Sequence, residues 1–294
     1  MVGMSAAEEI RQAQGGGRWF PGSASALKAS VEGYLTAAAV PAVTGRIVAA
    51  IAPHAGYPYS GPVAGFAFRA IRDNAASNGA PDVVVVLGFS HRQGFHGLAL
   101  MDGDVLTTPM GKSALDRESA AALTSGTDRI YFRYGPHQGE HSAENEVPFV
   151  QAILPAAPLV VGLFGDHDGE TLSTVVSALE KLARKKKVLV IASTDLLHDP
   201  DYDKVTRTDA VTVRRIAALD EEALVRSWSP HQQVCCGLMP VLAAVRFARA
   251  QGCAAGQVLR YRNSGDDHPE SRGEWVVGYG AIVFAVRSEG AVAR

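Results

Sequence analysis

The chain has few cysteines. Only Cys235, Cys236 and Cys253 occur among its 294 residues. Two of them are adjacent, where an ordinary disulfide is strained, and the total is odd, so the sequence predicts no disulfide framework. No CxxC pair indicates a structural zinc site either. We therefore expect the protein to work in a reducing compartment, the cytoplasm.

No sign of charge dominates the chain. Lys and Arg total 28 against 30 Asp and Glu, which is a formal net charge of -2. This balance provides no general attraction to nucleic acid or to an anionic membrane, so we expect neither as a partner. The one basic cluster, at residues 184–187, follows a predicted helix, where cations complement the helix dipole.

Long hydrophobic runs are absent as well. The longest apolar stretches, such as residues 82–87, are the length of a strand, far below the roughly 20 residues needed to span a bilayer. The N-terminus lacks the basic and apolar segments of a secretory signal. Residues 1–16 are polar and end in glycine, so we expect a flexible segment there, followed by a single domain over residues 17–294.

Short apolar runs alternate with amphipathic stretches along the rest of the chain. Strands are predicted at residues 46–51, 83–87, 159–164, 187–192, 258–262 and 275–286. Helices are predicted after Ser23, as their N-cap, and at residues 61–71, 170–184, 209–219 and 237–250. Continuous apolarity is typical of strands that are covered on both faces. The alternation predicts an α/β fold with helices on both faces of a mostly parallel or mixed sheet.

Four of the predicted strands end in a short polar segment that contains His, Asp or both. These segments contain His54, His91, residues 166–168, and Asp195 with His198. Ligands of open α/β sheets bind outside the carboxyl ends of the strands, so these side chains are expected to share one pocket. His54 and His91 hold equivalent places after two buried strands, and neutral imidazole is a good metal ligand. Residues 166–168 are instead predicted to cap the following helix.

A second polar concentration spans residues 137–145. His137 and His141 lie within it, and a helix beginning at Ser142 would have that residue as its cap and Glu144 in its first turn. His141 is then expected to point toward the pocket at the strand ends. Capping explains Ser142 and Glu144 about as well as a functional role does.

A turn that contains Cys235 and Cys236 precedes an apolar helix. The N-terminus of a helix favours the thiolate, which is both the nucleophile and the metal ligand. Adjacent side chains cannot face one point, so at most one of the two cysteines is expected to be functional. Burial as a small apolar residue explains either of them equally well, and Cys253 is predicted to be incidental. Three histidines in loops are predicted to lie at the surface: His96, His231 and His268.

Several of these segments, in this order, resemble the Memo family. They are residues 51–57 (IAPHAGY), 87–91 (LGFSH), 140–144 (EHSAE), 193–195 (STD) with His198, and 236–237 (CG). The two ends, at residues 18–22 (RWFPG) and at 264–266 (SGD) with 277–280 (VGYG), are similar too. The resemblance covers residues 17–286. It implies a three-layer α/β/α fold of the LigB type, related to the class III extradiol non-haem iron dioxygenases.

The resemblance also implies a metal site. Carried over residue by residue, its ligands are His54, His91 and Cys236, and its metal is a redox ion, Fe(II) or copper. The choice of Cys236 over Cys235 comes from the resemblance alone. Glu146 is a departure, since many members of the family have His at that position.

The resemblance further places His141, Asp195 and His198 in the pocket, and three hypotheses about function follow. The first is a dioxygenase-like oxidoreductase acting on a small molecule or O2, in which His141 or His198 is the acid or base and Asp195 orients a ligand or a histidine. The second is a metal-binding or peptide-binding module without turnover, although no arginine cluster suited to phosphate is apparent near the pocket. The third is a metal-assisted hydrolase, in which Asp195 or His141 replaces Cys236.

Overall fold

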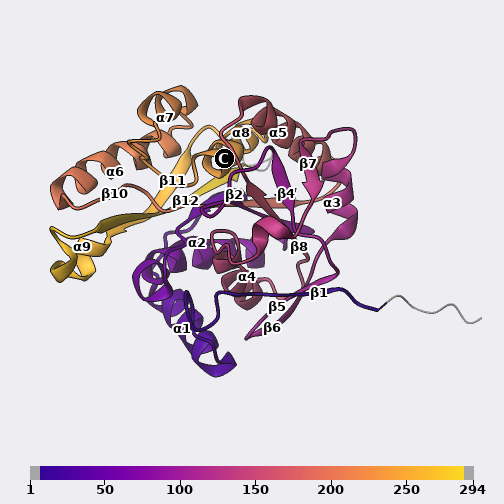
Figure 1. Ribbon diagram of the computed structural model, residues 1–294, viewed down its shortest axis with the longest axis horizontal. Helices are drawn as coiled ribbons and strands as arrows, with labels where there is room; N and C mark the ends of the chain where they lie inside the picture. The colour runs from indigo at the N-terminus through magenta and orange to yellow at the C-terminus, as the bar shows by residue number, and fades with distance from the viewer. Residues whose placement is uncertain (1–6, 288–294) are drawn as a thin grey trace, which may run out of the picture.

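A mixed sheet forms the middle layer of the computed structural model, which describes residues 7–287 (Figure 1). Its four central strands run parallel, in the order β2 (Arg46–Ala52), β9 (Val188–Ser193), β3 (Val83–Phe89) and β8 (Leu159–Phe164). Nearly every residue of these strands is buried, because helices cover both faces of the sheet. Burial on both faces explains their continuously apolar sequences.

The outer strands make the sheet mixed, as the sequence predicts. β12 (Val276–Val286) pairs antiparallel with β2, and both β11 (Gly256–Asn263) and β10 (His198–Asp199) pair antiparallel with β12. At the opposite end, β4 (Leu98–Leu100) is antiparallel to β8 and parallel to β7 (Ile130–Phe132). β4 and β7 are not predicted from the sequence, because strands of three residues are too short to show a pattern.

Helices form the two outer layers, so the chain is a three-layer α/β/α protein. One face of the sheet is covered by α1 (Ala24–Ala37), α2 (Tyr57–Asn78) and α4 (Val147–Ile153). The other is covered by α3 (Arg117–Thr124), α5 (Gly169–Ala183), α6 (Tyr202–Ala217), α7 (Glu221–Ser227) and α8 (Leu238–Ala250). The short α9 (Ser264–Asp267) follows β11.

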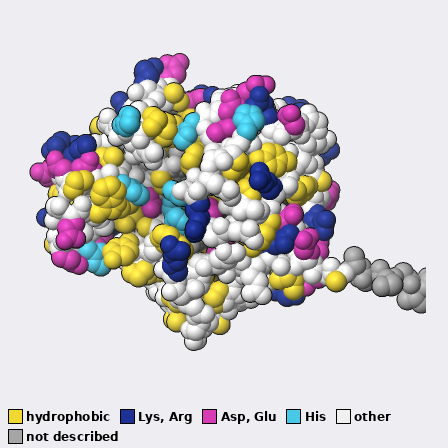
Figure 2. All heavy atoms as spheres, in the orientation of Figure 1, with side chains coloured by type: hydrophobic (Ala, Val, Ile, Leu, Met, Phe, Trp, Pro, Cys, Tyr) yellow, Lys and Arg dark blue, Asp and Glu magenta, His cyan; other side chains and the backbone are white. Residues whose placement is uncertain are grey.

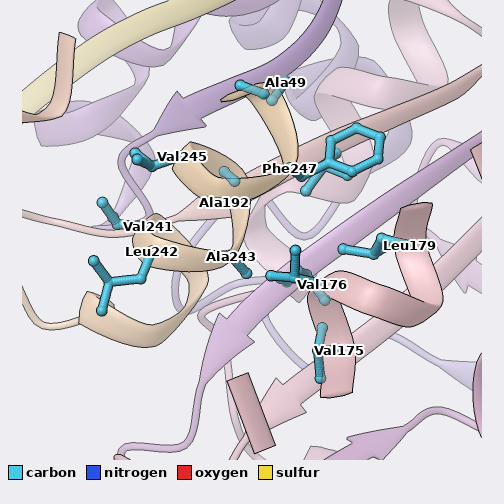
Figure 3. Close-up of a cluster of buried hydrophobic side chains, with 14 of the residues drawn as sticks. Ala49, Val175, Val176, Leu179, Ala192, Val241, Leu242, Ala243, Val245 and Phe247 are labelled. Atoms are coloured by element: carbon cyan, nitrogen blue, oxygen red, sulfur yellow. The ribbon is translucent and has the colours of Figure 1, made fainter. Parts of the chain in front are cut away.

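The packing of α5 and α8 shows what holds the second of these layers on the sheet. Figure 3 shows side chains of α5 (Val175, Val176 and Leu179) close to those of α8 (Val241, Leu242, Ala243, Val245 and Phe247), with Ala49 and Ala192 from the strands beneath. All of them are less than 8% exposed. Full burial of one Val, Leu or Phe side chain contributes roughly 1.5–3 kcal/mol.

The helix starts follow from local sequence. Ser23 caps α1 by accepting a hydrogen bond from Ala26 N at 3.3 Å, and Asp168 caps α5 by accepting one from Thr171 N at 2.7 Å, so both predicted caps are confirmed. α2 is longer than predicted and begins four residues earlier. Pro58 lies in its first turn, where the missing N–H of proline is tolerated.

A second, smaller sheet joins the N-terminal segment to the rest of the chain. It contains β1 (Ile10–Gln12), β5 (Val105–Thr108) and β6 (Gly111–Ala114), in that order. The segment predicted to be flexible therefore includes a strand, and its first six residues lie outside the described part of the chain. Within residues 7–287, no helix has the length and apolar character that crossing a membrane requires.

Candidate metal centre

The carboxyl ends of the parallel strands bring the predicted histidines together. His54 lies two residues beyond β2, and His91 lies two residues beyond β3. With His141 they form a triangle whose ring centroids are 5.2 Å (His54 to His91), 5.3 Å (His54 to His141) and 5.1 Å (His91 to His141) apart. Figure 2 shows histidine side chains gathered in a hollow of this face, next to Lys or Arg side chains.

Cys236 lies directly against this triangle. Its Sγ is 3.4 Å from Nε2 of His54, and one ligand atom from each of His54, His91 and Cys236 lies within 4.8 Å of the other two. An ion with ligands about 2.0–2.3 Å away spans separations of this order, so the three side chains fit a metal ion. Gly237 allows the loop that carries Cys236 to lie close to the end of β9, since a Cβ at position 237 would be 2.6 Å from the carbonyl oxygen of Ser193.

The neighbouring Cys235 points the other way. It is fully buried in the hydrophobic core between the sheet and α8, and burial raises the pKa of its thiol. The structure therefore brings Cys236 into the site and leaves Cys235 as a small apolar core residue. Cys253 is also buried, away from the site.

Glu140 orients His91. Its Oε2 accepts a hydrogen bond from His91 N at 2.6 Å, and its Oε1 accepts one from the ring Nδ1 at 3.0 Å. Burial opposes charge on the ring, but hydrogen bonds and negative charge from Cys236 and Glu140 raise the pKa of His91 to about 10. Because Nδ1 is engaged by Glu140, Nε2 of His91 is the nitrogen that a metal ion would bind, in place of the proton that it carries below this pKa.

A second possible ligand set consists of His91, Glu140 and His141. Glu140 fits this role poorly, because its Oε1 also accepts hydrogen bonds from His141 N at 2.9 Å and Ser142 N at 3.0 Å. The ring of His141 stacks on Trp19, with centroids 3.8 Å apart and planes 4° from parallel. His141 thus forms one wall of the site, and the set with Cys236 fits a metal better.

Asp195 ties the loops of two ligands together. Its Oδ1 accepts hydrogen bonds from His54 N at 2.9 Å and Ala55 N at 3.2 Å. Its backbone N donates to Cys236 Sγ at 3.3 Å, and its carbonyl accepts from Cys236 N at 3.1 Å. Burial raises the pKa of this carboxyl group.

His198 lines a different cavity from His141. Together with Cys236, Lys204 and Trp275 it lines a cavity of about 320 Å³. Its ring lies nearly perpendicular to that of Trp275, with centroids 6.2 Å apart, and partial desolvation lowers its pKa although the residue is exposed. Of the predicted pocket residues, His198 thus lines the cavity at Cys236, and His141 lies against the two histidines.

A further cavity of about 330 Å³ opens beside His141 and Glu140. Arg18 and Arg92 line it, and Arg92 donates a hydrogen bond to Gly139 O at 2.9 Å. Two arginines therefore line a cavity beside the pocket, which is not apparent from the sequence. The two residues are 74 positions apart, so no local pattern in the sequence indicates that they line one cavity.

Comparison with known proteins identifies the family of this chain. Residues 11–283 match a family model described as Memo-like protein. The chain belongs to the Memo family. A MEMO1 family protein from Methanopyrus kandleri is 33% identical over 243 residues, which are 80% of this chain and 82% of the relative. One from Aeropyrum pernix is 30% identical over 288 residues, which are 93% of this chain and 99% of the relative. A solved structure of an uncharacterized protein from Escherichia coli K12 has a TM-score of 0.49 and 11% identity, covering 80% of this chain and 99% of that one.

One predicted cap in this Memo-family chain is wrong. No helix begins at Ser142; instead a 3-10 turn at Glu144–Glu146 leads into α4, and Ser142 Oγ donates to Phe89 O at 2.9 Å. Glu144 accepts hydrogen bonds from Gln14 N at 2.7 Å and Gly15 N at 2.6 Å, so it holds the N-terminal segment. Burial raises the pKa of Glu144 to about 7.

The remaining histidines have other surroundings. His137 is buried, with Nε2 3.1 Å from Ala99 O, and burial lowers its pKa to about 4. His167 packs at a tilt against Phe89 and Trp228, with ring centroids 4.5 Å and 4.1 Å away. The three histidines predicted at the surface, His96, His231 and His268, lie outside the ligand set, although the exposed His231 lines the cavity beside Cys236.

Ser193, the last residue of β9, is a site residue that is not predicted from the sequence. Its Oγ lies 2.9 Å from Nδ1 of His54 and 2.6 Å from Oε1 of Glu146. Its position at the end of a buried strand could have indicated this role, because the other site residues were predicted from the same kind of position. Glu146, the departure from the family pattern, is 1% exposed and contacts the site through Ser193.

Proposed function

We propose that this Memo-family protein binds a redox metal ion, Fe(II) or copper, through His54, His91 and Cys236 and oxidises a small molecule with O2. The observation that carries the proposal is the convergence of two imidazoles and one thiol, with Cys236 Sγ 3.4 Å from His54 Nε2. Two imidazoles and a thiolate leave coordination positions open, and a redox ion held there would supply electrons to O2.

The other residues of the pocket are suited to handling the substrate. The cavity of about 320 Å³ beside Cys236 has both aromatic and polar walls, as a small-molecule site does. The surroundings of His198 lower the pKa of its imidazole, which favours the neutral form that can accept a proton from a molecule bound in this cavity. His141, stacked on Trp19, lines the other cavity, of about 330 Å³.

Metal analysis of single variants tests the ligand set. The protein is purified anaerobically, loaded with Fe(II) or Cu(I), and its metal content is measured by mass spectrometry. We expect His54→Ala, His91→Ala and Cys236→Ala each to lose the ion. His96→Ala and Cys253→Ala, which change the same residue types outside the ligand set, should bind as the parent does. A parent without metal, or ligand variants that all retain it, would refute the proposal.

Oxygen consumption separates an enzyme from a module without turnover. The loaded protein is supplied with a reductant or a catechol-like compound, and uptake of O2 is recorded. Metal binding without uptake would favour the binding module. The cavity with Arg18 and Arg92 favours that second candidate, because two guanidinium groups suit a carboxylate or phosphate on a peptide.

The hydrolase hypothesis finds less support in the contacts of Asp195. A hydrolytic metal site would need this carboxylate or His141 in place of Cys236. Oδ1 of Asp195 already accepts two backbone N–H groups, and its Oδ2 lies 4.0 Å from His54 Nε2. The geometry therefore favours the soft thiolate as the third ligand.

A further inference from the structure

Ser193 Oγ has three close polar neighbours. They are the carbonyl oxygen of Ser142 at 2.5 Å, Oε1 of Glu146 at 2.6 Å and Nδ1 of His54 at 2.9 Å. All three neighbouring residues and Ser193 itself are buried. A serine hydroxyl has one proton to donate and two lone pairs with which to accept, so the three contacts determine where the protons are.

The carbonyl oxygen of Ser142 can only accept. At 2.5 Å it must receive the single proton of Ser193, because two bare oxygens would repel each other at that distance. Ser193 therefore has no proton left for Glu146 or His54. Both of these neighbours must donate to it, which requires a protonated Glu146 carboxyl group and an Nδ1–H on His54.

We propose that Glu146 and Ser193 are positioning residues: Glu146 is a neutral acid that donates to Ser193, and Ser193 holds His54 in the Nδ1–H tautomer. The lone pair on Nε2 of His54 is then directed at the site next to Cys236. The protonation pattern depends only on these contacts, whereas its value for metal binding rests on the proposed function.

The surroundings of Glu146 agree with a neutral acid. The residue is 1% exposed, and within the described part of the chain no hydrogen-bond partner is found for its Oε2 and no ion pair for its carboxyl group. An unpaired buried oxygen is far less costly on a neutral acid than on a carboxylate. Burial, reinforced by the nearby charge of Asp195, raises the pKa of Glu146 well above its usual range.

Two spectroscopic measurements on the metal-free protein test the inference. Infrared difference spectra of the parent against Glu146→Gln should show the C=O band of a neutral carboxylic acid at neutral pH, with a shift in D2O. Nitrogen-15 spectra of labelled histidine should show His54 protonated at Nδ1, with the signal assigned by its loss in His54→Ala. A parent without the acid band, or with the proton of His54 on Nε2, would overturn the inference.

Metal affinity gives a second, independent readout. Ser193→Ala removes the acceptor for His54 Nδ1–H and should weaken binding of Fe(II) or Cu(I) about 10–100-fold. Glu146→Gln keeps an N–H donor where the acid had its O–H, and should bind within a few-fold of the parent. Normal affinity in Ser193→Ala would contradict a positioning role. A parent that binds neither metal would refute the proposed function, while the two spectra would still decide the protonation pattern.

Discussion

Sγ of Cys236 lies 3.4 Å from Nε2 of His54, although 182 positions separate the two residues in the chain. Backbone contacts maintain this closeness, because Asp195 binds the main chain of both: its carboxylate accepts from His54 N, and its carbonyl accepts from Cys236 N. A side-chain rotation alone therefore does not separate the two ligands. The backbones of three loops at the end of the sheet determine this arrangement.

Replacing His141 by alanine should leave metal binding intact. In the ligand set that fits best, His141 is a wall residue stacked on Trp19 and not a ligand. We expect unchanged metal content and, if His141 transfers protons, turnover lower by about 100-fold or more. Metal content by mass spectrometry and O2 uptake are the measurements. Loss of the ion in His141→Ala would instead support the set of His91, Glu140 and His141.

Glu140→Gln should weaken both the metal site and the fold. Both carboxylate oxygens accept hydrogen bonds, Oε2 from His91 N and Oε1 from His91 Nδ1 and Ser142 N. Glutamine replaces one of these oxygens with an amide nitrogen, which cannot accept. We expect a loss of about 1.5–3 kcal/mol in the free energy of unfolding. Metal affinity, measured by chelator competition, should fall about 10–100-fold. Glu118→Gln, on a side chain that is 86% exposed, is the control and should change neither quantity.

Asp209 should make stability depend on pH. It is fully buried, with Oδ1 accepting from Leu197 N at 3.1 Å and Oδ2 3.0 Å from Tyr261 OH, and burial raises its pKa to about 7. Between about pH 4 and 7 the folded protein holds a proton that the unfolded chain has released. The free energy of unfolding therefore decreases as pH rises through this range, by up to about 4 kcal/mol.

Asp209→Asn imitates the protonated acid and should remove this dependence. Its amide can accept from Leu197 N and donate to the hydroxyl of Tyr261. We expect the variant to be more stable than the parent above about pH 7, with a flatter profile below it. Urea unfolding at a series of pH values from about 5 to 8 measures the difference. Parallel profiles for the two proteins would show that Asp209 is not the group responsible.

Gly278→Ala should be strongly destabilising. A Cβ at this position in β12 would lie 1.7 Å from Oδ2 of Asp209 and 3.1 Å from Cβ of Leu196. We expect a loss of about 2–3 kcal/mol, seen as a lower melting temperature. Gly33→Ala, in α1 with no atom within 4 Å of the added Cβ, should instead stabilise by about 0.5–1 kcal/mol. Equal effects of the two substitutions would contradict the packing described here.

Much of the fold can be predicted from local sequence. The buried strands β2, β3, β8 and β9 lie within a residue or two of their predicted bounds, because continuous apolarity reports burial on both faces wherever it occurs. The caps at Ser23 and Asp168 are equally local. The short strands between residues 98 and 132, and the strand at residues 10–12, show no such pattern, since pairing with distant segments stabilises them.

For the site, the sequence by itself determined that polar residues follow the strands, and hence that His54 and His91 lie at one edge of the sheet. Only the tertiary structure decided which side chains meet there. It turned Cys236 inward and Cys235 into the core, brought Arg18 close to the site, and placed Ser193 between His54 and Glu146. The physical reason is that strand burial and capping depend on near neighbours in the chain. Contacts within the site depend on strand order and on loops that join residues far apart in sequence.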